Sequence, residues 1–170
     1  MARIAYGNVE DPHNAALVAR ITVERGRVGD LYRMLLNSPA VCEGWLAFLT
    51  AIRQKCVLDA RYREMVIIRV AELNGAEHEK RSHLPHARDA GLTDEDIAAL
   101  ADWNRAPGFD EVDRAVLAYA DAMTLDVHVS DVVFNAVNRH FDEREMTELT
   151  ATIAAYNLVS RFLVALHVGH

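Results

Sequence analysis

The chain has 170 residues, of which 51% are hydrophobic, and its formal net charge is −7. This length and composition are typical of one globular domain that buries its own core, so we predict a single domain over residues 1–170. The acidic balance, without any run of lysine and arginine, argues against a surface for nucleic acids or anionic membranes. Small molecules and other protein chains remain as the expected partners.

Two features bear on the compartment. The two cysteines, Cys42 and Cys56, form no CxxC pair and no disulfide-rich pattern, which favours a reducing environment. The N-terminal residues lack the long apolar core of a signal peptide. The most apolar stretch, residues 151–168, contains Asn157, Ser160 and Arg161, which favours a buried or interface helix over a membrane span. We therefore expect a cytoplasmic protein with no membrane partner.

Helix signals begin with Asp11-Pro12 and Ser38-Pro39, each of which reads as an N-cap followed by proline at the first helical position. Gly26 is expected to end the first of these two helices. The second helix carries one apolar stripe, whose members recur at spacings of three and four: Val41, Trp45, Phe48, Leu49 and Ile52.

The middle of the chain predicts two helices joined by a tight break. Asp59 can cap a helix that runs through Leu73, and Asn74-Gly75 is a typical stop signal. The next helix is expected to run to Gly91.

Four further helices complete the chain. Thr93 with Asp96 predicts a capping box, and longer helices are expected over residues 110–125, 130–141 and 142–167. No segment alternates with period two, so the predicted class is all-α, with about eight helices. The last helix is apolar around nearly its whole circumference, which favours a subunit interface, with a central core helix as the alternative.

The stretch "AEHEKRSHLPHARDAG", Ala76 to Gly91, is rich in histidine and glutamate. His78 and His83 are five residues apart and so lie on different faces of a helix, which excludes the His-Glu-x-x-His zinc motif. Glu79, His83 and His86 do share one stripe that could in principle hold a metal. Such a coincidence is common on a polar helix, so we expect neither a metal nor a cofactor.

Two neighbours of this cluster bear on its chemistry. Pro85 inside the helix predicts a kink or a local opening beside His83. If the chain turns back at Asn74-Gly75, Glu64 faces a point near Pro85, next to His83. A carboxylate beside an imidazole stabilises the protonated ring and fixes its tautomer, as in a general acid or base. An ordinary structural Glu-His pair between two helices explains the same residues equally well.

The run "LDARYREMVIIRVAELNGAEHEKRSHLPHARDAGLTDEDIAAL", Leu58 to Leu100, resembles the carboxymuconolactone decarboxylase family, which includes the AhpD-type alkylhydroperoxidases. Its central pattern is an Arg-Glu pair, then Asn-Gly, then a helix with Glu and His. The flanking runs "RVGDLYRMLLNSPAVCEGWLAFLTAI" and "HFDEREMTELTATIAAYNLVSRFLVAL" extend the resemblance over most of the chain. It implies an AhpD-like all-α fold and a homo-oligomer, a dimer, trimer or hexamer, with sites near subunit contacts.

The redox members of this family carry Cys-x-His-Cys-x-x-x-His and an upstream glutamate. By spacing, Glu64 matches the upstream glutamate, and His78 and His83 match the two histidines. Ala76 and Glu79 stand where the cysteines would be. Peroxide reduction by a thiol pair needs one thiolate to attack and a second thiol to resolve, so this chain departs from the redox branch.

The resemblance to the decarboxylase branch implies a cofactor-free lyase or isomerase for a small carboxylated lactone. In it His83 would donate the proton, Glu64 would orient His83, and Glu79 would be a second acid or base. The substrate carboxylate would be held by the cationic side chains of the same helix, namely His78, Lys80, Arg81 and His86. Many non-redox members read Tyr-Glu-Trp where this chain has His-Glu-Lys at 78–80, so its pocket is expected to be more polar.

Two alternatives stay open. In the first, Glu64 and His83 are a retained structural pair in a non-catalytic oligomeric binding protein. In the second, the chain is an AhpD-like peroxidase that recruits Cys56, which the missing CxxC pair disfavours.

Overall fold

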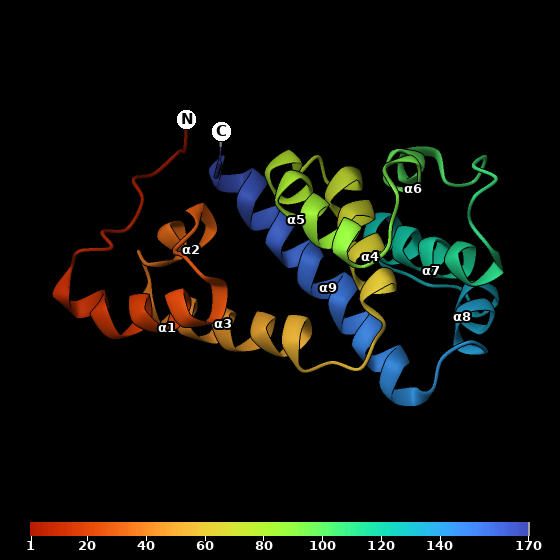
Figure 1. Ribbon diagram of the computed structural model, residues 1–170, viewed down its shortest axis with the longest axis horizontal. Coiled ribbons are helices and arrows are strands. Elements are labelled where there is room, and N and C mark those ends of the chain that lie inside the picture. The colour runs from red at the N-terminus through yellow and green to blue at the C-terminus, as the bar shows by residue number, and fades with distance from the viewer. Residues whose placement is uncertain (170) are drawn as a thin grey trace. The chain divides into compact units, whose positions relative to one another are not determined.

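The computed structural model describes residues 1–169, and every regular element in them is helical. Nine α-helices are present in this part of the chain, which confirms the predicted all-α class (Figure 1). The residues form two compact units, one of residues 1–55 and 163–169 and the other of residues 56–162. The single-domain organisation over the whole chain stays a prediction.

The first unit contains α1 (Ala15–Arg25), α2 (Asp30–Leu35) and α3 (Pro39–Gln54), preceded by a 3-10 turn, Pro12–Asn14. Asp11 caps that turn, because its Oδ1 accepts a hydrogen bond from the His13 backbone at 2.9 Å. The α-helix that was predicted to begin at Pro12 begins at Ala15 instead.

Both ends of the chain contribute to the first unit. The Arg3 backbone N–H donates to the Leu166 carbonyl at 3.0 Å, and the Gly169 N–H donates to the Tyr6 hydroxyl at 3.2 Å. Gly7 donates to the Arg33 carbonyl at 2.8 Å. A Cβ atom on Gly7 would lie 2.8 Å from the Leu36 carbonyl carbon, so this crossing requires glycine.

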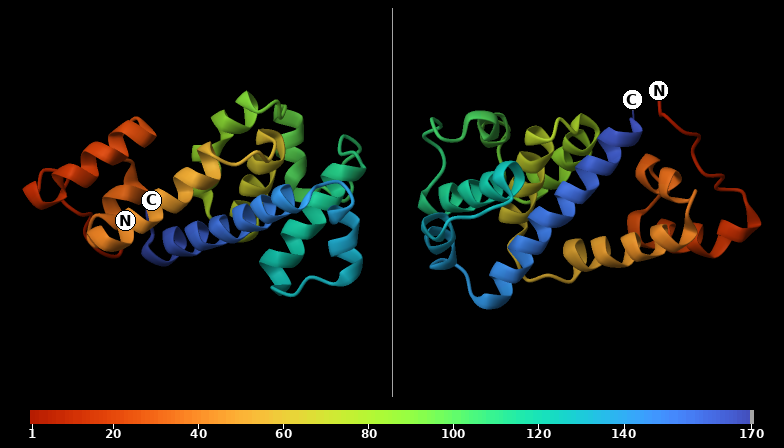
Figure 2. Two further views of the ribbon diagram at one scale, coloured as in Figure 1. Left: turned by 90° about the horizontal axis from the view of Figure 1, so that it is seen from below. Right: turned by 180° about the vertical axis from the view of Figure 1, so that it is seen from behind.

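The second unit is built around two neighbouring antiparallel helices, α4 (Ala60–Leu73) and α5 (Glu77–Asp89), which lie side by side in Figures 1 and 2. Asp59 Oδ1 accepts from the Arg61 N–H at 2.7 Å, as the predicted cap requires. The chain reverses at Gly75, whose φ of 65° lies in the left-handed region that glycine adopts without strain. The predicted turn at Asn74-Gly75 is therefore confirmed.

The helix α5 does not open at Pro85. It is one continuous α-helix from Glu77 to Asp89. His83 and Ala87, on either side of the proline, are both buried, and their packing holds the chain in a helical path despite the missing N–H. The local opening expected beside His83 is therefore wrong.

The remaining elements of this unit are α6 (Asp94–Ala99), a 3-10 turn (Leu100–Asp102), α7 (Glu111–Asp121), α8 (Asp131–Asn138) and α9 (Glu143–Leu166), whose last four residues belong to the first unit. The capping box of Thr93 and Asp96 is present. The helix predicted over residues 110–125 changes at Ala122 into a π-helix, Ala122–Asp126.

Arg69 ties α4 to the segment around α7. Its Nε and Nη2 donate to the two carboxylate oxygens of Asp121, each at 2.7 Å, and its Nη1 donates to the carbonyls of Leu100 and Ala101. Trp103 Nε1 donates to the same carboxylate at 3.0 Å. A guanidinium with every terminal donor used in this way is a structural clamp.

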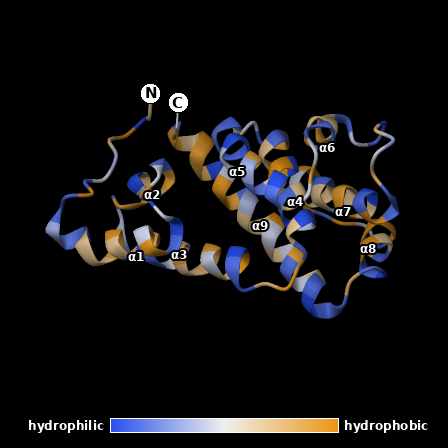
Figure 3. Cartoon of the chain, in the orientation of Figure 1, coloured by the Kyte–Doolittle hydropathy of each residue, from blue (hydrophilic) through white to orange (hydrophobic). Residues whose placement is uncertain are grey.

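The helix α9 is rich in hydrophobic residues (Figure 3), some of them buried and some exposed. Ile153, Tyr156 and Val159 are buried, whereas Leu158 is 47% and Val164 38% exposed. By length and composition α9 could also cross a membrane, a test that the core helix of a soluble protein passes as well, and half of its most apolar window is buried. The buried face supports the core-helix interpretation, and a subunit contact on the exposed face stays a prediction.

Candidate acid–base site

Three ionisable side chains meet inside the second unit. His83 Nδ1 lies 2.6 Å from Glu64 Oε2, and His83 Nε2 lies 3.2 Å from Glu79 Oε1. The three residues are 2%, 6% and 3% exposed for Glu64, Glu79 and His83, so water is almost excluded from the group. The structure therefore brings together the three residues predicted to be catalytic.

Local sequence explains this arrangement. Glu79 and His83 are four residues apart on α5 and share one face of the helix. The reversal at Gly75 then returns the chain along α4, so that Glu64 reaches the opposite side of the imidazole. Each ring nitrogen consequently faces one carboxylate.

The electrostatics favour the charged form of this pair. Burial is the largest single effect on His83 and works against its protonated form, but the hydrogen bonds with Glu64 and Glu79 outweigh it and raise the pKa of His83. Burial likewise works against ionised Glu64, but His83 and Arg63 lower the pKa of Glu64 overall. In the folded protein the pair therefore favours the form of an imidazolium beside a carboxylate.

Two further residues touch this group and were not predicted from the sequence. Arg63 Nε donates to Glu64 Oε1 at 3.2 Å, and its side chain is 17% exposed. The ring of Tyr156, from α9, stands perpendicular to the His83 ring with centroids 5.1 Å apart. Arg63 entered the sequence analysis only as the arginine of the Arg-Glu pair, without a role in the site. Tyr156 gave no signal, because its contact depends on how α9 packs.

The residues predicted to bind substrate are dispersed around this helix. Lys80 Nζ already donates to Glu72 Oε1 at 2.6 Å. His78 is half-buried and Arg81 is exposed. His86 is exposed, with its ring centroid 5.6 Å from that of His83. Their binding role stays a prediction, and only His86 lies against the buried group.

The stripe of Glu79, His83 and His86 offers no metal-binding arrangement. Both nitrogens of His83 face carboxylates as hydrogen-bonding partners. Among residues 1–169, no group of three histidine, cysteine or acidic side chains is arranged so that it could hold a metal ion.

Neither cysteine is activated. Burial raises the pKa of the Cys42 thiol to about 11. Burial, followed by the charge of Glu148, raises the pKa of Cys56, although Arg63 and Arg144 act in the opposite direction. Both side chains therefore favour the thiol over the nucleophilic thiolate.

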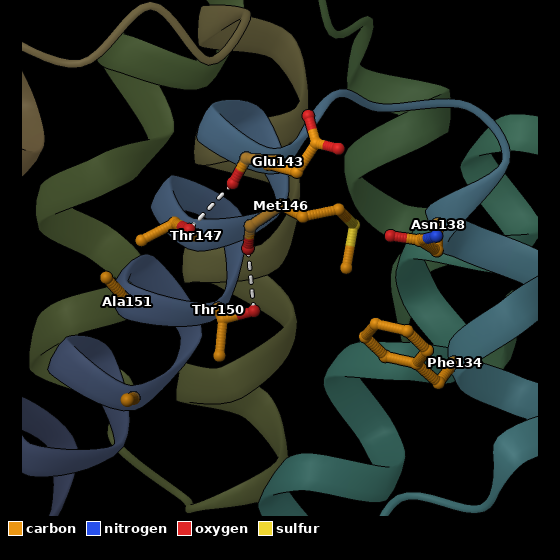
Figure 4. Close-up of a pocket in the computed structure, with 8 residues that line it drawn as sticks. Phe134, Asn138, Glu143, Met146, Thr147, Thr150 and Ala151 are labelled. Atoms are coloured by element: carbon orange, nitrogen blue, oxygen red, sulfur yellow. Dashed lines mark hydrogen bonds between the residues drawn. The ribbon is translucent and has the colours of Figure 1, made fainter.

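A separate open pocket of about 570 Å³ lies between α8 and the first half of α9 (Figure 4). Phe134 and Met146 give it apolar walls, and the hydroxyls of Thr147 and Thr150 are bonded back to the carbonyls of Glu143 and Met146, each at 2.7 Å. It is lined by none of the residues predicted to form the site.

Comparison with known proteins finds a family model and two relatives that this chain resembles. Residues 39–122 match the model of the carboxymuconolactone decarboxylase family. The uncharacterized protein YnjA of Escherichia coli is 32% identical over 127 residues, 74% of this chain and 66% of YnjA. The uncharacterized protein YdfG of Bacillus subtilis is 29% identical over 106 residues, 61% of this chain and 72% of YdfG. The matched region thus spans slightly less than two thirds of the first relative.

Solved structures show the same fold. A protein of unknown function from Agrobacterium tumefaciens, ATU0492, considered an AhpD antioxidant defence protein, has a TM-score of 0.75 and 25% identity over 80% of this chain and 94% of its own. The debrominase Bmp8 in complex with 2,3,4-tribromopyrrole has a TM-score of 0.82 at 15% identity, covering 99% and 92%. A peroxidase-related protein from Silicibacter has a TM-score of 0.82 at 16% identity, covering 98% and 90%. At these low identities the last two show the fold alone.

Proposed function

Because residues 39–122 of this chain belong to the carboxymuconolactone decarboxylase family, we propose that the protein is a cytoplasmic, cofactor-free acid–base enzyme. It acts as a lyase or isomerase on a small carboxylated substrate of the lactone type. The observation that carries this proposal is the buried Glu64–His83–Glu79 group, in which one imidazole bridges two carboxylates.

Each member of the group has a different task. Glu64 is hydrogen-bonded to Nδ1 of His83. It thereby stabilises the protonated imidazole and fixes the orientation of the ring. Both ring nitrogens are engaged within the chain, so a proton reaches the substrate through Glu79, on the Nε2 side. Glu79 then contacts the substrate and relays to it the proton that His83 supplies.

For a decarboxylation, the bond to the carboxylate carbon breaks, carbon dioxide leaves, and the electron pair stays on the substrate as a dienolate. The imidazolium of His83 passes its Nε2 proton to the carboxylate of Glu79, and Glu79 passes a proton on to that carbanion, which leaves a neutral imidazole beside the carboxylate. A proton from solvent then restores the imidazolium. Because the site is nearly dry, the charges act more strongly there than they would in water.

The test uses a panel of unsaturated lactones with a carboxylate, incubated with the protein in heavy water and followed by NMR for loss of carbon dioxide or uptake of deuterium. His83→Asn and Glu79→Gln are each expected to lower kcat by about 10²–10⁴-fold while the protein stays folded. His128→Asn, in an exposed loop, is the control and should match the wild type. Turnover that survives both substitutions would refute the site.

A second candidate, a non-catalytic oligomeric binding protein, is favoured by one observation. His83 is 3% exposed and both of its nitrogens are paired, as a purely structural ion pair would be. In that case His83→Asn and Glu79→Gln change the free energy of unfolding, and no lactone in the panel is turned over or exchanged by the wild type.

We further propose that the protein forms a homo-oligomer, a dimer, trimer or hexamer, through the exposed apolar face of α9. Leu158, which is 47% exposed, lies on this face. Light scattering on the Leu158→Glu variant should show a smaller species than the wild type, and an unchanged mass would exclude this face from the contact.

A further inference from the structure

Arg63 is the one half-buried arginine of the second unit whose terminal amino groups have no acceptor among residues 1–169. In the other three buried or half-buried arginines, both terminal amino groups have acceptors in the protein. Arg61 makes both of its terminal bonds to Asp113, Arg69 is shared between Asp121 and two carbonyls, and Arg114 donates to four backbone carbonyls. At Arg63, by contrast, solvent or a ligand must accept from these groups.

The geometry shows which donors are vacant. Arg63 uses only Nε, which donates to Glu64 Oε1 at 3.2 Å. The end-on edge of the guanidinium, formed by Nη1 and Nη2, is free of protein acceptors within the described chain. Neither nitrogen belongs to the fully buried polar atoms that lack a partner, so solvent reaches this edge although the side chain is only 17% exposed. Two parallel N–H groups of this kind match the two oxygens of a carboxylate.

The surroundings leave Arg63 available to an external anion. Glu64, the hydrogen-bond partner of Arg63 among residues 1–169, gives its other oxygen to His83 at 2.6 Å. Glu148, which like Arg63 acts on the Cys56 thiol, is already bonded to the backbone N–H groups of Val57 and Leu58, at 2.7 and 2.8 Å, and to Arg144 at 3.0 Å. Both carboxylates are therefore engaged elsewhere.

We propose that the vacant edge of Arg63 binds a carboxylate group of the substrate and is the specificity-determining contact of the site. This proposal rests on the acid–base function above, because it is through Glu64 that Arg63 borders the Glu64–His83–Glu79 group. The bound carboxylate is a second one, away from the reacting carbon, since tight pairing of the leaving carboxylate with a cation would oppose loss of carbon dioxide. The substrate class is thus a small acid with an anchoring carboxylate, in contrast to a neutral lactone.

Binding is tested with 2-furoate, a flat five-membered ring with a carboxylate, and with the neutral 2-furamide. Titrations up to about 50 mM, followed by calorimetry and by the ¹H–¹⁵N signal of the Arg63 Nε–H, cover the millimolar range expected of so small a ligand. Furoate should bind the wild type at least about tenfold more tightly than furamide, because only furoate can accept both N–H bonds.

Substitutions of Arg63 test whether this residue binds the carboxylate. Arg63→Gln should lower the affinity for furoate to that for furamide, and Arg63→Lys, which keeps the charge and loses the planar edge, should lie between. Arg105→Gln, at an exposed site, is the control and should bind as the wild type does. Equal binding of furoate and furamide, or no furoate binding at all, overturns the proposal. A loss of furoate affinity in Arg81→Gln, without such a loss in Arg63→Gln, also overturns the proposal.

Glu79→Gln separates this proposal from the function on which it rests. It removes the acid and leaves Arg63 in place. This variant should still bind furoate more tightly than furamide, because that preference depends on Arg63, whether or not the wild type turns over any lactone. Failure of catalysis and failure of carboxylate binding are therefore visible in different measurements.

Discussion

Glu64 Oε2 and His83 Nδ1 lie 2.6 Å apart in the interior, although they are separated by nineteen positions in the chain. The pKa of His83 is raised and that of Glu64 is lowered, so both groups favour the ionised pair in the folded state. Each shift links the free energy of unfolding to pH, in opposite directions.

The wild type should be most stable between about pH 4.5 and 6.5, the ordinary values of the two groups. His83 contributes fully below its ordinary pKa, and its contribution is lost as pH rises through its raised value. Glu64 contributes above its ordinary pKa, and its contribution is lost as pH falls through its lowered value. Urea unfolding over a pH series measures both slopes.

Glu64→Gln should flatten those slopes and lower the free energy of unfolding by about 3 kcal/mol near pH 6, because it leaves a buried imidazolium with one carboxylate partner fewer. His128→Asn, in an exposed loop, should keep the wild-type profile. A Glu64→Gln profile that is parallel to the wild type would show that the pair does not titrate as proposed.

The approach of these two residues could be predicted from sequence because it depends on local signals. The Asp59 cap fixes where α4 begins, and Asn74-Gly75 fixes where the chain reverses. Arg63 and Tyr156 were not predicted, because the free edge of one and the ring contact of the other depend on the packing of helices that are distant in sequence.

In the fold, too, the features set by local sequence signals could be predicted, and those set by tertiary packing could not. The helices with a capping residue or a proline at the start were predicted closely, including α3 after Ser38-Pro39. The helix α2 was not predicted as a separate element, since it is six residues long and Gly29 at its N-cap makes no side-chain hydrogen bond. Pro85 gave a misleading signal, because burial on both sides of it overrides its local preference.

Arg69→Lys should destabilise the protein by about 2–4 kcal/mol, because one ammonium group cannot replace donors to Asp121 and to two carbonyls at once. Chemical denaturation measures the change. Arg105→Lys, whose side chain is 87% exposed, should lie within about 0.5 kcal/mol of the wild type. If the two variants were equally stable, Arg69 would not be a clamp.

Cys56→Ser should leave any consumption of peroxide at the wild-type level. The thiol of Cys56 has a raised pKa, and a protonated thiol is a poor nucleophile. Peroxide loss is measured with a thiol reductant present, and Cys42→Ser serves as the parallel variant. A large drop in Cys56→Ser alone would instead support the peroxidase interpretation.

Gly7→Ala should lower the free energy of unfolding by about 1–3 kcal/mol, because the new Cβ would lie 2.8–2.9 Å from backbone atoms of Leu36 and Asn37. Gly29→Ala is the matched control, since a Cβ at Gly29 has nothing within 4 Å. Thermal melts of the two variants should differ by several degrees, and equal melts would show that the backbone yields at Gly7 at little cost.

The bonds of Arg3 to Leu166 and of Tyr6 to Gly169 set an order of events during synthesis. The first 55 residues emerge from the ribosome long before residues 163–169, which complete their unit. A nascent chain stalled before residue 163 should therefore be cleaved by protease within α1–α3, and a chain long enough to expose residues 163–169 outside the ribosome should be protected there. Residues that are synthesised much later thus complete the unit that residues 1–55 begin.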